Sequence, residues 1–211
     1  GSTASLACPN MMLNTAVADE LMQFADSLEK ADDFKGALNS LIKKTIHDHK
    51  RIIFNGNNYS PEWVAEAKRR GLLNLRSTVD CMPYYIKEDN IRLFQRHKVL
   101  SKPEVHARYE IELENYYKQI HIEALTMLDM AKKDILPAAV DYMKDLGAEI
   151  ASKKSLGVEA VFEEKLLNKL SALCDDLYAH LEKLEQSVKG APAEGDVLST
   201  AKYYRGTIFA E

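Results

Sequence analysis

Two histidines close together in the sequence are the first candidates for metal chemistry. The segment HDHK (47–50) places His47 and His49 two positions apart. On a helix, residues i and i+2 point about 200° apart, so these two imidazoles cannot share one ion. Metal-binding pairs on helices are spaced i and i+4, as in HExxH. We therefore interpret this segment as a solvated helix end.

A second metal hypothesis is a di-iron centre of the ferritin kind, which needs Glu-x-x-His on two helices of a bundle. No glutamate here has a histidine three residues later. His106 and Glu110 are spaced i and i+4, as are Asp176 and His180, but neither pair has a matching partner motif. We interpret both as surface pairs, each worth about a few tenths of a kcal/mol. A metal-dependent oxidase stays a third functional hypothesis, and it predicts bound iron.

The three cysteines are isolated in the sequence. Cys8, Cys81 and Cys174 form no CxxC pair, and Cys174 lies near a leucine ladder. This pattern favours a buried structural thiol over a nucleophile. An odd number of widely spaced cysteines is also typical of a reducing compartment, so we expect a cytoplasmic protein.

Three other features are candidates for ligand binding. The segment NGNNYS (55–60) has one glycine and does not follow a βαβ pattern, so a structured turn is favoured, with a ligand loop as the alternative. The run KRR (68–70) is best explained as charge at a helix C-terminus. Paired tyrosines at helical spacing are more often core or interface residues than ligand platforms. These pairs are Tyr84 and Tyr85, Tyr116 and Tyr117, and Tyr203 and Tyr204.

Composition excludes several functional classes. The chain has 211 residues, 46% of them hydrophobic, and a net charge of -4. This size suits one large domain or two small ones, with enough apolar residues for a core. The acidic balance gives no general attraction to nucleic acid or to an anionic membrane. The sequence has neither a signal-peptide pattern nor an apolar run long enough to span a bilayer.

Helical periodicity dominates the chain. The first apolar stripe has spacings of 4, 4, 3 and 4 residues between positions 13 and 28, and a second helix is expected from Phe34. Ser60 and Pro61 are typical of a helix start, and Gly71 of its end. Residues 72–86 look irregular, and a short helix is expected around 87–97. The last helix is expected to begin in DVLSTAKYY (196–204) and to stop without a capping signal.

Two long ladders lie in the second half of the chain. SKPE (101–104) offers a capping box for the first, which continues to Leu146 in steps of 4, 4 and 3. About 45 residues would form a rod of about 70 Å, kinked or divided at Pro137. The second ladder runs from Phe162 to Val188. A short connection between them predicts an antiparallel pair. The fold class predicted is therefore all-α, a helical bundle with a long antiparallel helix pair.

Four segments carry a resemblance to one family. GSTASLACPNMMLNTAVADEL resembles the end of the catalytic domain in type III glutamine synthetases, the large bacterial class. The chain is similar to that family in three further segments. These are IIFNGNNYSPEWVAEAKRRGLLNL (52–75), RYEIELENYYKQIHIEALTMLDMAKKDILPA (108–138) and AKYYRGTIFAE (201–211). The resemblance covers nearly the whole chain and implies that the chain begins inside a larger protein, just after its catalytic barrel.

The resemblance implies a parent enzyme that joins ammonia to glutamate with ATP, through a γ-glutamyl phosphate. ATP and Mg or Mn would serve the parent, with no cofactor in this fragment. The family's metal-binding acids, ATP site and glutamate-binding arginines lie upstream, so no catalytic, cofactor-binding or metal residue is assigned here. The implied partners are the rest of the synthetase chain and neighbouring subunits of a homo-oligomer, with no nucleic acid and no membrane.

The resemblance also suggests a division of the chain. Residues 1–30 would be a remnant of the catalytic domain, and residues 31–211 a C-terminal helical domain with a long hairpin at about 102–188. That hairpin would brace the catalytic domain or contact neighbouring subunits, and the fragment alone would be inactive. The rival hypothesis is a self-sufficient helical interaction module that binds a partner through NGNNY and the tyrosine pairs.

Overall fold

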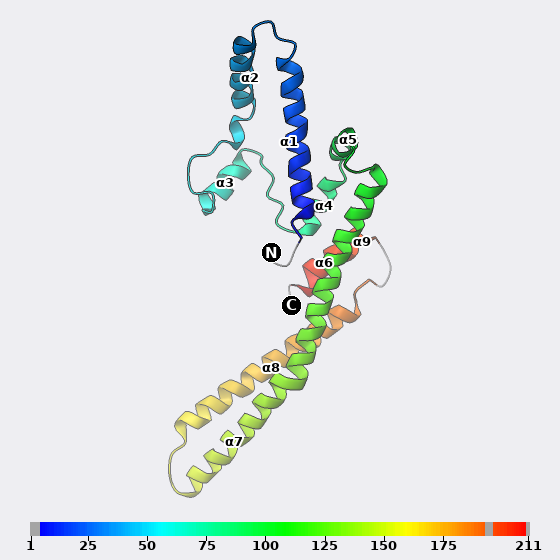
Figure 1. The fold of residues 1–211 in the computed structure, drawn as a ribbon. Helices are drawn as coiled ribbons and strands as arrows, with labels where there is room; N and C mark the ends of the chain where they lie inside the picture. Colours follow the sequence, from blue (N-terminus) through cyan, green and yellow to red (C-terminus); the bar gives the residue numbers. More distant parts are fainter. Residues whose placement is uncertain (1–4, 193–195, 210–211) are drawn as a thin grey trace. The chain divides into compact units, whose positions relative to one another are not determined.

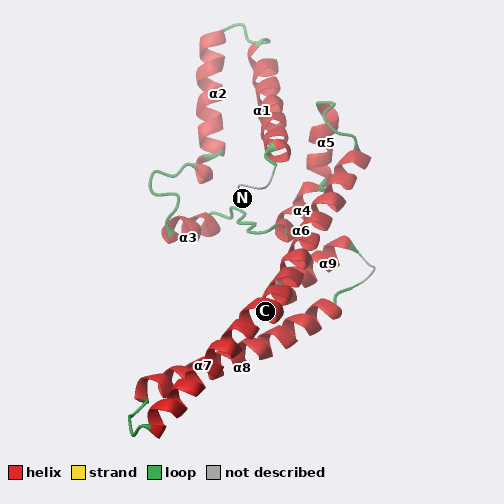
Figure 2. Ribbon diagram, turned by 60° about the horizontal axis from the view of Figure 1, so that its bottom comes forward, coloured by secondary structure: helices red, strands yellow, loops and turns green. Residues whose placement is uncertain are grey.

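A computed structural model of the chain describes residues 5–192 and 196–209, and the regular structure in these residues is entirely helical (Figures 1 and 2). The predicted all-α class is confirmed. The α-helices are α1 (Ala7–Leu28), α2 (Phe34–Asp48), α3 (Pro61–Arg69), α4 (Thr78–Tyr85), α5 (Glu88–Arg96), α6 (Lys102–Met130), α7 (Leu136–Ser155), α8 (Val161–Lys189) and α9 (Val197–Tyr203). A 3₁₀ turn, η1 (Lys50–Ile52), and two π turns, η2 (Ala131–Ile135) and η3 (Tyr204–Ile208), complete the set.

The chain separates into two compact units, and the division falls between Tyr109 and Glu110, inside α6. We describe each unit by itself. The boundary expected near residue 30 concerns the domains of the parent enzyme and stays a prediction.

In the first unit, α1 and α2 lie side by side and run antiparallel (Figures 1 and 2). The side chain of Asp33 accepts a hydrogen bond from the backbone N–H of Gly36 and so caps the start of α2. α3 begins with Pro61 at its first position, and Gly71 follows its end with φ of 72°. The predicted signals of Pro61 and Gly71 are therefore confirmed, whereas Ser60 lies at the N-cap position without a capping hydrogen bond from its side chain.

Residues 72–86 were expected to be irregular, and this expectation is wrong for Thr78–Tyr85, which form α4. Ser77 caps the helix by accepting a hydrogen bond from the N–H of Asp80, and its hydroxyl donates to the Asp80 carboxylate. Pro83 lies inside this helix and lacks an N–H. Because it lies in the last turns, it removes one hydrogen bond without preventing the cap from starting the helix. The short helix expected around 87–97 is confirmed as α5.

The long rod is divided by a π turn next to its proline. The N–H of Leu136 donates to the carbonyl of Ala131, five residues earlier. Pro137 cannot donate, so the carbonyl of Lys133 loses its usual α-helical partner. A π turn is a common way of accommodating such an interruption. The division expected at Pro137 is therefore present, and α7 resumes with this proline in its first turn.

In the second unit, α7 and α8 pack side by side and antiparallel (Figure 1), whereas the hairpin predicted at about 102–188 begins in the first unit. The connection begins with a Schellman motif at the end of α7. Gly157 has φ of 72° and donates to Lys154, while Val158 donates to Lys153. Ion pairs join the two helices near this end, between Lys153 and Glu163 and between Lys154 and Glu164.

The core of the second unit lies where α8, α9 and η3 meet α6. It is a hydrophobic cluster with aliphatic side chains from α6 and α8 and one aromatic ring from η3. Its buried members are Ile120, Ala124, Leu128, Ala131, Leu181, Leu184, Tyr204 and Ile208. The last helix begins at Val197 as predicted, after Asp196 caps it by accepting from the N–H of Ser199. The sequence expectation for residues 210 and 211 lies outside the described residues.

Candidate functional site

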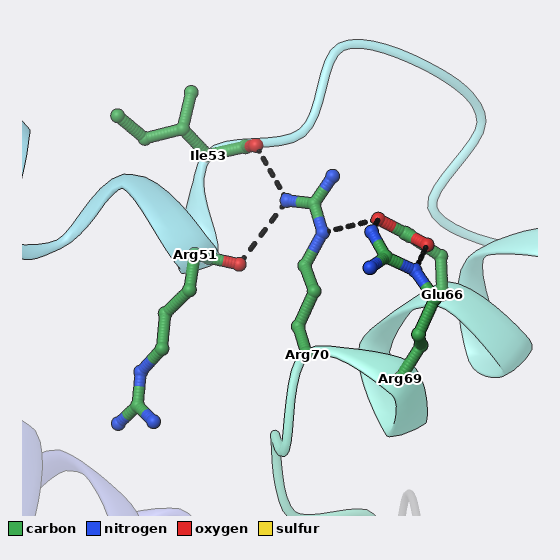
Figure 3. Close-up of polar contacts among 5 residues, drawn as sticks. All are labelled: Arg51, Ile53, Glu66, Arg69 and Arg70. Carbon is green, nitrogen blue, oxygen red and sulfur yellow. Dashed lines mark hydrogen bonds and ion pairs between the residues drawn. The ribbon is translucent and has the colours of Figure 1, made fainter.

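One polar site of the first unit is centred on Arg70, the residue that follows α3. One of its terminal nitrogens, Nη1, donates to the carbonyl oxygens of Arg51 (3.1 Å) and Ile53 (2.9 Å). Its Nε donates to Glu66 Oε1 at 2.5 Å. Figure 3 shows this guanidinium between the backbone that leaves η1 and the side chain of Glu66. Arg70 therefore fastens a segment about twenty residues earlier to the end of α3.

An aromatic pair lies against the same guanidinium. The rings of Phe54 and Trp63 stack with centroids 4.2 Å apart. The Arg70 Cζ lies 6.0 Å from the Phe54 ring centre and 5.6 Å from that of Trp63, within cation–π distance. A Cβ added at Gly56 would lie 2.6 Å from the Phe54 ring. The loop needs glycine at this position because the ring passes so close to its backbone.

Glu66 carries the charge that balances the arginines. Arg69 donates to both of its carboxylate oxygens at 2.6 Å, and Arg70 adds a third bond. Hydrogen bonds from Arg69 and then Arg70 lower the pKa of Glu66 from 4.5 to about 2. Glu66 is thus ionised throughout the physiological range, and the run KRR is more than helix-end charge because two of its members share this carboxylate.

The loop NGNNYS is a structured turn, as favoured from its sequence. The side chain of Asn57 accepts a hydrogen bond from the N–H of Tyr59 at 3.0 Å, and the N–H of Ser60 donates to the Asn57 carbonyl. The Tyr59 side chain extends into solvent and is 98% exposed. This arrangement positions Tyr59 for contact with another molecule, but it contains no catalytic pair.

The histidines named from sequence do not gather into a metal centre. His47 and His49 lie at the exposed end of α2, where His47 pairs with Asp48. His180 lies 3.7 Å from Asp176, which agrees with a surface i, i+4 pair. Among the residues the structure describes, no three His, Cys, Asp or Glu side chains are placed to hold a metal ion.

The cysteines are partly buried, including Cys174, which was expected to be buried. Tyrosines 203 and 204 belong to the second unit's core, as expected for such pairs. Tyr203 donates to the Ser187 carbonyl at 2.8 Å, and the Tyr204 hydroxyl lies 3.0 Å from His121 Nδ1. Burial raises the pKa of Tyr204, so this phenol stays protonated at neutral pH.

Sequence reasoning missed a second polar cluster in the first unit. The buried carboxylate of Asp19 on α1 receives Arg96 Nη1 and lies against His97 Nε2, each at 2.8 Å. Gln23 donates to its other oxygen at 2.9 Å. The hydrogen bond with His97 is the largest cause that lowers the pKa of Asp19. The sequence carried no signal for this cluster, because Asp19 lies off the apolar stripe predicted between positions 13 and 28, and its partners lie some 77 residues later.

The two clusters offer charged hydrogen bonding and aromatic contact, with no nucleophile beside a general base. Comparison with known proteins decides the family. A family model described as the glutamine synthetase C-terminal domain matches residues 37–154. The chain belongs to this glutamine synthetase family. The matched range contains the Arg70 site, α6 and nearly all of α7, and it ends one residue before the last residue of α7.

Three glutamine synthetases illustrate the relationship. A glutamine synthetase of Butyrivibrio fibrisolvens is 44% identical over 88% of this chain and 27% of its own length. A type-3 glutamine synthetase of Dictyostelium discoideum is 36% identical over 72% of the chain and 21% of its own. One of Bacteroides fragilis is 30% identical over 77% of the chain and 23% of its own. The chain therefore spans about a quarter of the length of these relatives.

The described part of this synthetase piece has no helix that meets the length and hydropathy needed to cross a membrane.

Proposed function

We propose that this chain is the C-terminal helical piece of a type III glutamine synthetase and that it contributes structure and assembly instead of catalysis. The observation that carries the proposal is the family match over residues 37–154, in a chain that spans about a quarter of its relatives. The parent enzyme would ligate ammonia to glutamate through a γ-glutamyl phosphate, using ATP and Mg or Mn bound outside this chain. Three free cysteines suit the reducing cytoplasm, where we place the parent.

An apolar groove in the second unit is the surface we assign to assembly. It has a volume of about 720 Å³ and lies between the C-terminal part of α6, η2 and α8. Met127 is 59% exposed and Leu173 54% exposed on its walls. Exposed apolar side chains gathered in one groove are typical of a protein contact surface, and methionine adapts well to an uneven partner. We therefore assign this groove to contact with the rest of the synthetase chain or with a neighbouring subunit.

The catalytic part of the proposal is tested with the purified chain. Glutamine formation from glutamate, ammonia and MgATP is measured beside the full-length parent enzyme as the positive control. We expect activity from the parent and none from the chain. Glutamine formed by the pure chain would overturn the proposal.

The assembly part is tested in the parent enzyme. Met127→Glu combined with Leu173→Glu places two charges in the groove. Val140→Glu combined with Val158→Glu is the matched control, because both valines are exposed to a similar degree and do not line the groove. Sedimentation velocity should show a smaller oligomer for the groove variant alone. A groove variant that sediments like the unaltered enzyme would contradict the contact with a neighbouring subunit.

The self-sufficient interaction module stays the alternative, and the exposed ring of Tyr59 is the observation in its favour. It predicts a partner that binds through the loop. Because the Asn57 side chain also forms the turn, Asn58 is the cleaner position for its test. An Asn58 variant that loses a binding partner without losing helicity would favour this alternative.

The oxidase hypothesis still predicts bound iron, which elemental analysis of the purified chain measures.

A further inference from the structure

A strongly basic cavity lies in the first unit, beside the Arg70 site. It is open to solvent, has a volume of about 910 Å³, and lies between the end of α2, η1 and the end of α3. Five residues on its walls are lysines or arginines, and among the described residues that line it none is acidic. They are Lys43, Lys50, Arg51, Arg69 and Arg70. The cavity is unusual in a chain whose net charge is -4.

The acids near the cavity neutralise only part of this charge. Glu66 is bonded to Arg69 and Arg70, and Asp48 is paired with Lys44 and His47. In the described part of the chain, Lys43, Lys50 and Arg51 form no ion pair. Like charges that converge on one cavity repel one another and lower stability. A bound anion would remove this cost.

Two features give the cavity the character of a binding site. The bonds of Arg70 to Glu66 and to two backbone carbonyls hold one wall in place, so that wall is ordered before any ligand arrives. Ile46 and Ile53 add apolar surface between the cations. The cavity therefore combines charge for an oxyanion with room for a small carbon skeleton or a second anionic group.

We propose that this cavity binds a small polyvalent oxyanion, a molecule that carries two or more phosphate or carboxylate groups. Guanidinium and ammonium groups bind both kinds of oxyanion with charge-assisted hydrogen bonds. A small ligand is favoured over nucleic acid because the free cations converge on one cavity while the chain as a whole is acidic. Lys50 and Arg51 supply charge to the ligand, and Glu66 keeps the arginines beside it in place.

The single tryptophan provides a direct readout. Trp63 stacks on Phe54 and lies 5.6 Å from Arg70 Cζ, so a ligand at this wall changes its emission. The intact 211-residue chain is titrated with inorganic pyrophosphate and, separately, with tricarballylate, at constant ionic strength. Isothermal titration calorimetry gives the dissociation constants. Saturation with either anion supports the proposal, and the anion that saturates identifies which oxyanion chemistry the site takes.

Two charge-matched double variants locate the site. Lys50→Gln combined with Arg51→Gln removes two cavity charges and leaves the Arg51 carbonyl in place. Lys165→Gln combined with Lys169→Gln removes two charges from α8, where neither lysine forms an ion pair with another described residue. We expect the cavity variant to bind the saturating anion about tenfold more weakly or worse, as expected for lost charge-assisted bonds. The α8 variant should bind it unchanged, and circular dichroism checks that both variants are folded.

Three results would overturn the proposal. The first is that neither anion saturates the unaltered chain. The second is that the two double variants lose affinity equally, which would indicate a general charge effect. The third is that single-stranded RNA binds in the same assay and neither small anion does, which would make the cavity part of a polyanion surface.

Discussion

Arg69 and Arg70 are neighbours in the sequence that have different roles. Both bond to Glu66, but only Arg70 reaches the carbonyls of Arg51 and Ile53. The Arg70 side chain is 22% exposed and that of Arg69 is 73% exposed. A hydrogen bond formed in a partly buried place contributes more than one that competes fully with water. The stability of the loop before α3 therefore depends mainly on Arg70.

Arg70→Gln should lower the free energy of unfolding by about 2 kcal/mol, because the two carbonyls lose a charged donor. The measurement is urea unfolding followed by the emission of Trp63, which lies against the altered side chain.

Arg69→Gln is the control for this prediction, and it should change the midpoint of the transition very little. Equal losses from the two variants would show that the carboxylate bond, and not the bonds to the loop backbone, is what matters.

The Glu66 carboxylate predicts a pH dependence. Its pKa is lowered from 4.5 to about 2, so the folded state binds the proton more weakly than the unfolded state. The stability that it contributes is fully present above about pH 4.5 and is lost as the pH falls towards about 2.

Glu66→Gln removes this contribution at every pH. The difference in stability between the unaltered chain and this variant should thus be constant near neutrality and shrink in acid, as measured by urea midpoints from pH 7 to about 2. A difference that grows as the pH falls would contradict the prediction.

The i, i+4 spacing of Glu66 and Arg70 is visible in the sequence, so their ion pair is predictable. Their backbone acceptors are not, because carbonyl groups carry no sequence signal. The Asp19 cluster was missed for a related reason. Its partners Arg96 and His97 lie far away in the sequence, and local periodicity gives no information on which distant side chain meets a buried acid.

Asp19→Asn should destabilise the contact between α1 and α5. The amide keeps the size of the side chain but loses the charge that holds Arg96 and His97. The measure is the urea midpoint at pH 7, where the carboxylate with its lowered pKa is ionised. Asp26→Asn is the matched control on the same helix, because Asp26 is exposed and has no recorded partner. The Asp19 variant should unfold at clearly lower urea, and equal midpoints would refute the role assigned to the cluster.

At the scale of elements, periodicity and caps predicted the helices well. The start of α3 has Pro61 at its first position, and capping hydrogen bonds lie at Ser101 and Asp196. The long hairpin follows from two ladders of matching step. α4 was missed because residues 72–86 looked irregular in sequence, although Ser77 and Asp80 form a cap at its start. The π form of the turn before Pro137 could not be predicted, since a proline permits a kink, a break or a π turn.

Two glycines near the hairpin turn give opposite predictions for the same substitution. Gly157 has φ of 72°, and a Cβ there would meet no atom within 4 Å, so Gly157→Ala costs only backbone strain. We expect a loss of about 1 kcal/mol. Gly147 lies inside α7, also with open space, so Gly147→Ala should stabilise the helix by about 0.5–1 kcal/mol. Thermal unfolding followed by circular dichroism measures both. A Gly157 variant as stable as the unaltered chain would show that the turn does not require the left-handed conformation.

On the scale of the whole molecule, the family assignment came from resemblance, and the unit boundary came from structure. Composition and spacing give an all-α protein with a long hairpin. They give neither the division after Tyr109 nor the fact that a single helix contains it. A continuous helical pattern carries no mark where tertiary contacts change from one set to another, because both sets use the same 3.6-residue periodicity.

The two units can be followed separately because the only tryptophan, Trp63, lies in the first unit, while most of the long hairpin's circular dichroism comes from the second. Leu184 is a buried member of the second unit's cluster, so Leu184→Ala should cost that unit about 3 kcal/mol. Leu125→Ala, at an exposed position of α6, is the control and should cost little. We expect the second unit to unfold on its own. The Leu184 variant should then shift the circular dichroism transition to lower urea and leave the Trp63 transition in place. Equal shifts in both signals would instead mean that α6 couples the two units into one cooperative transition.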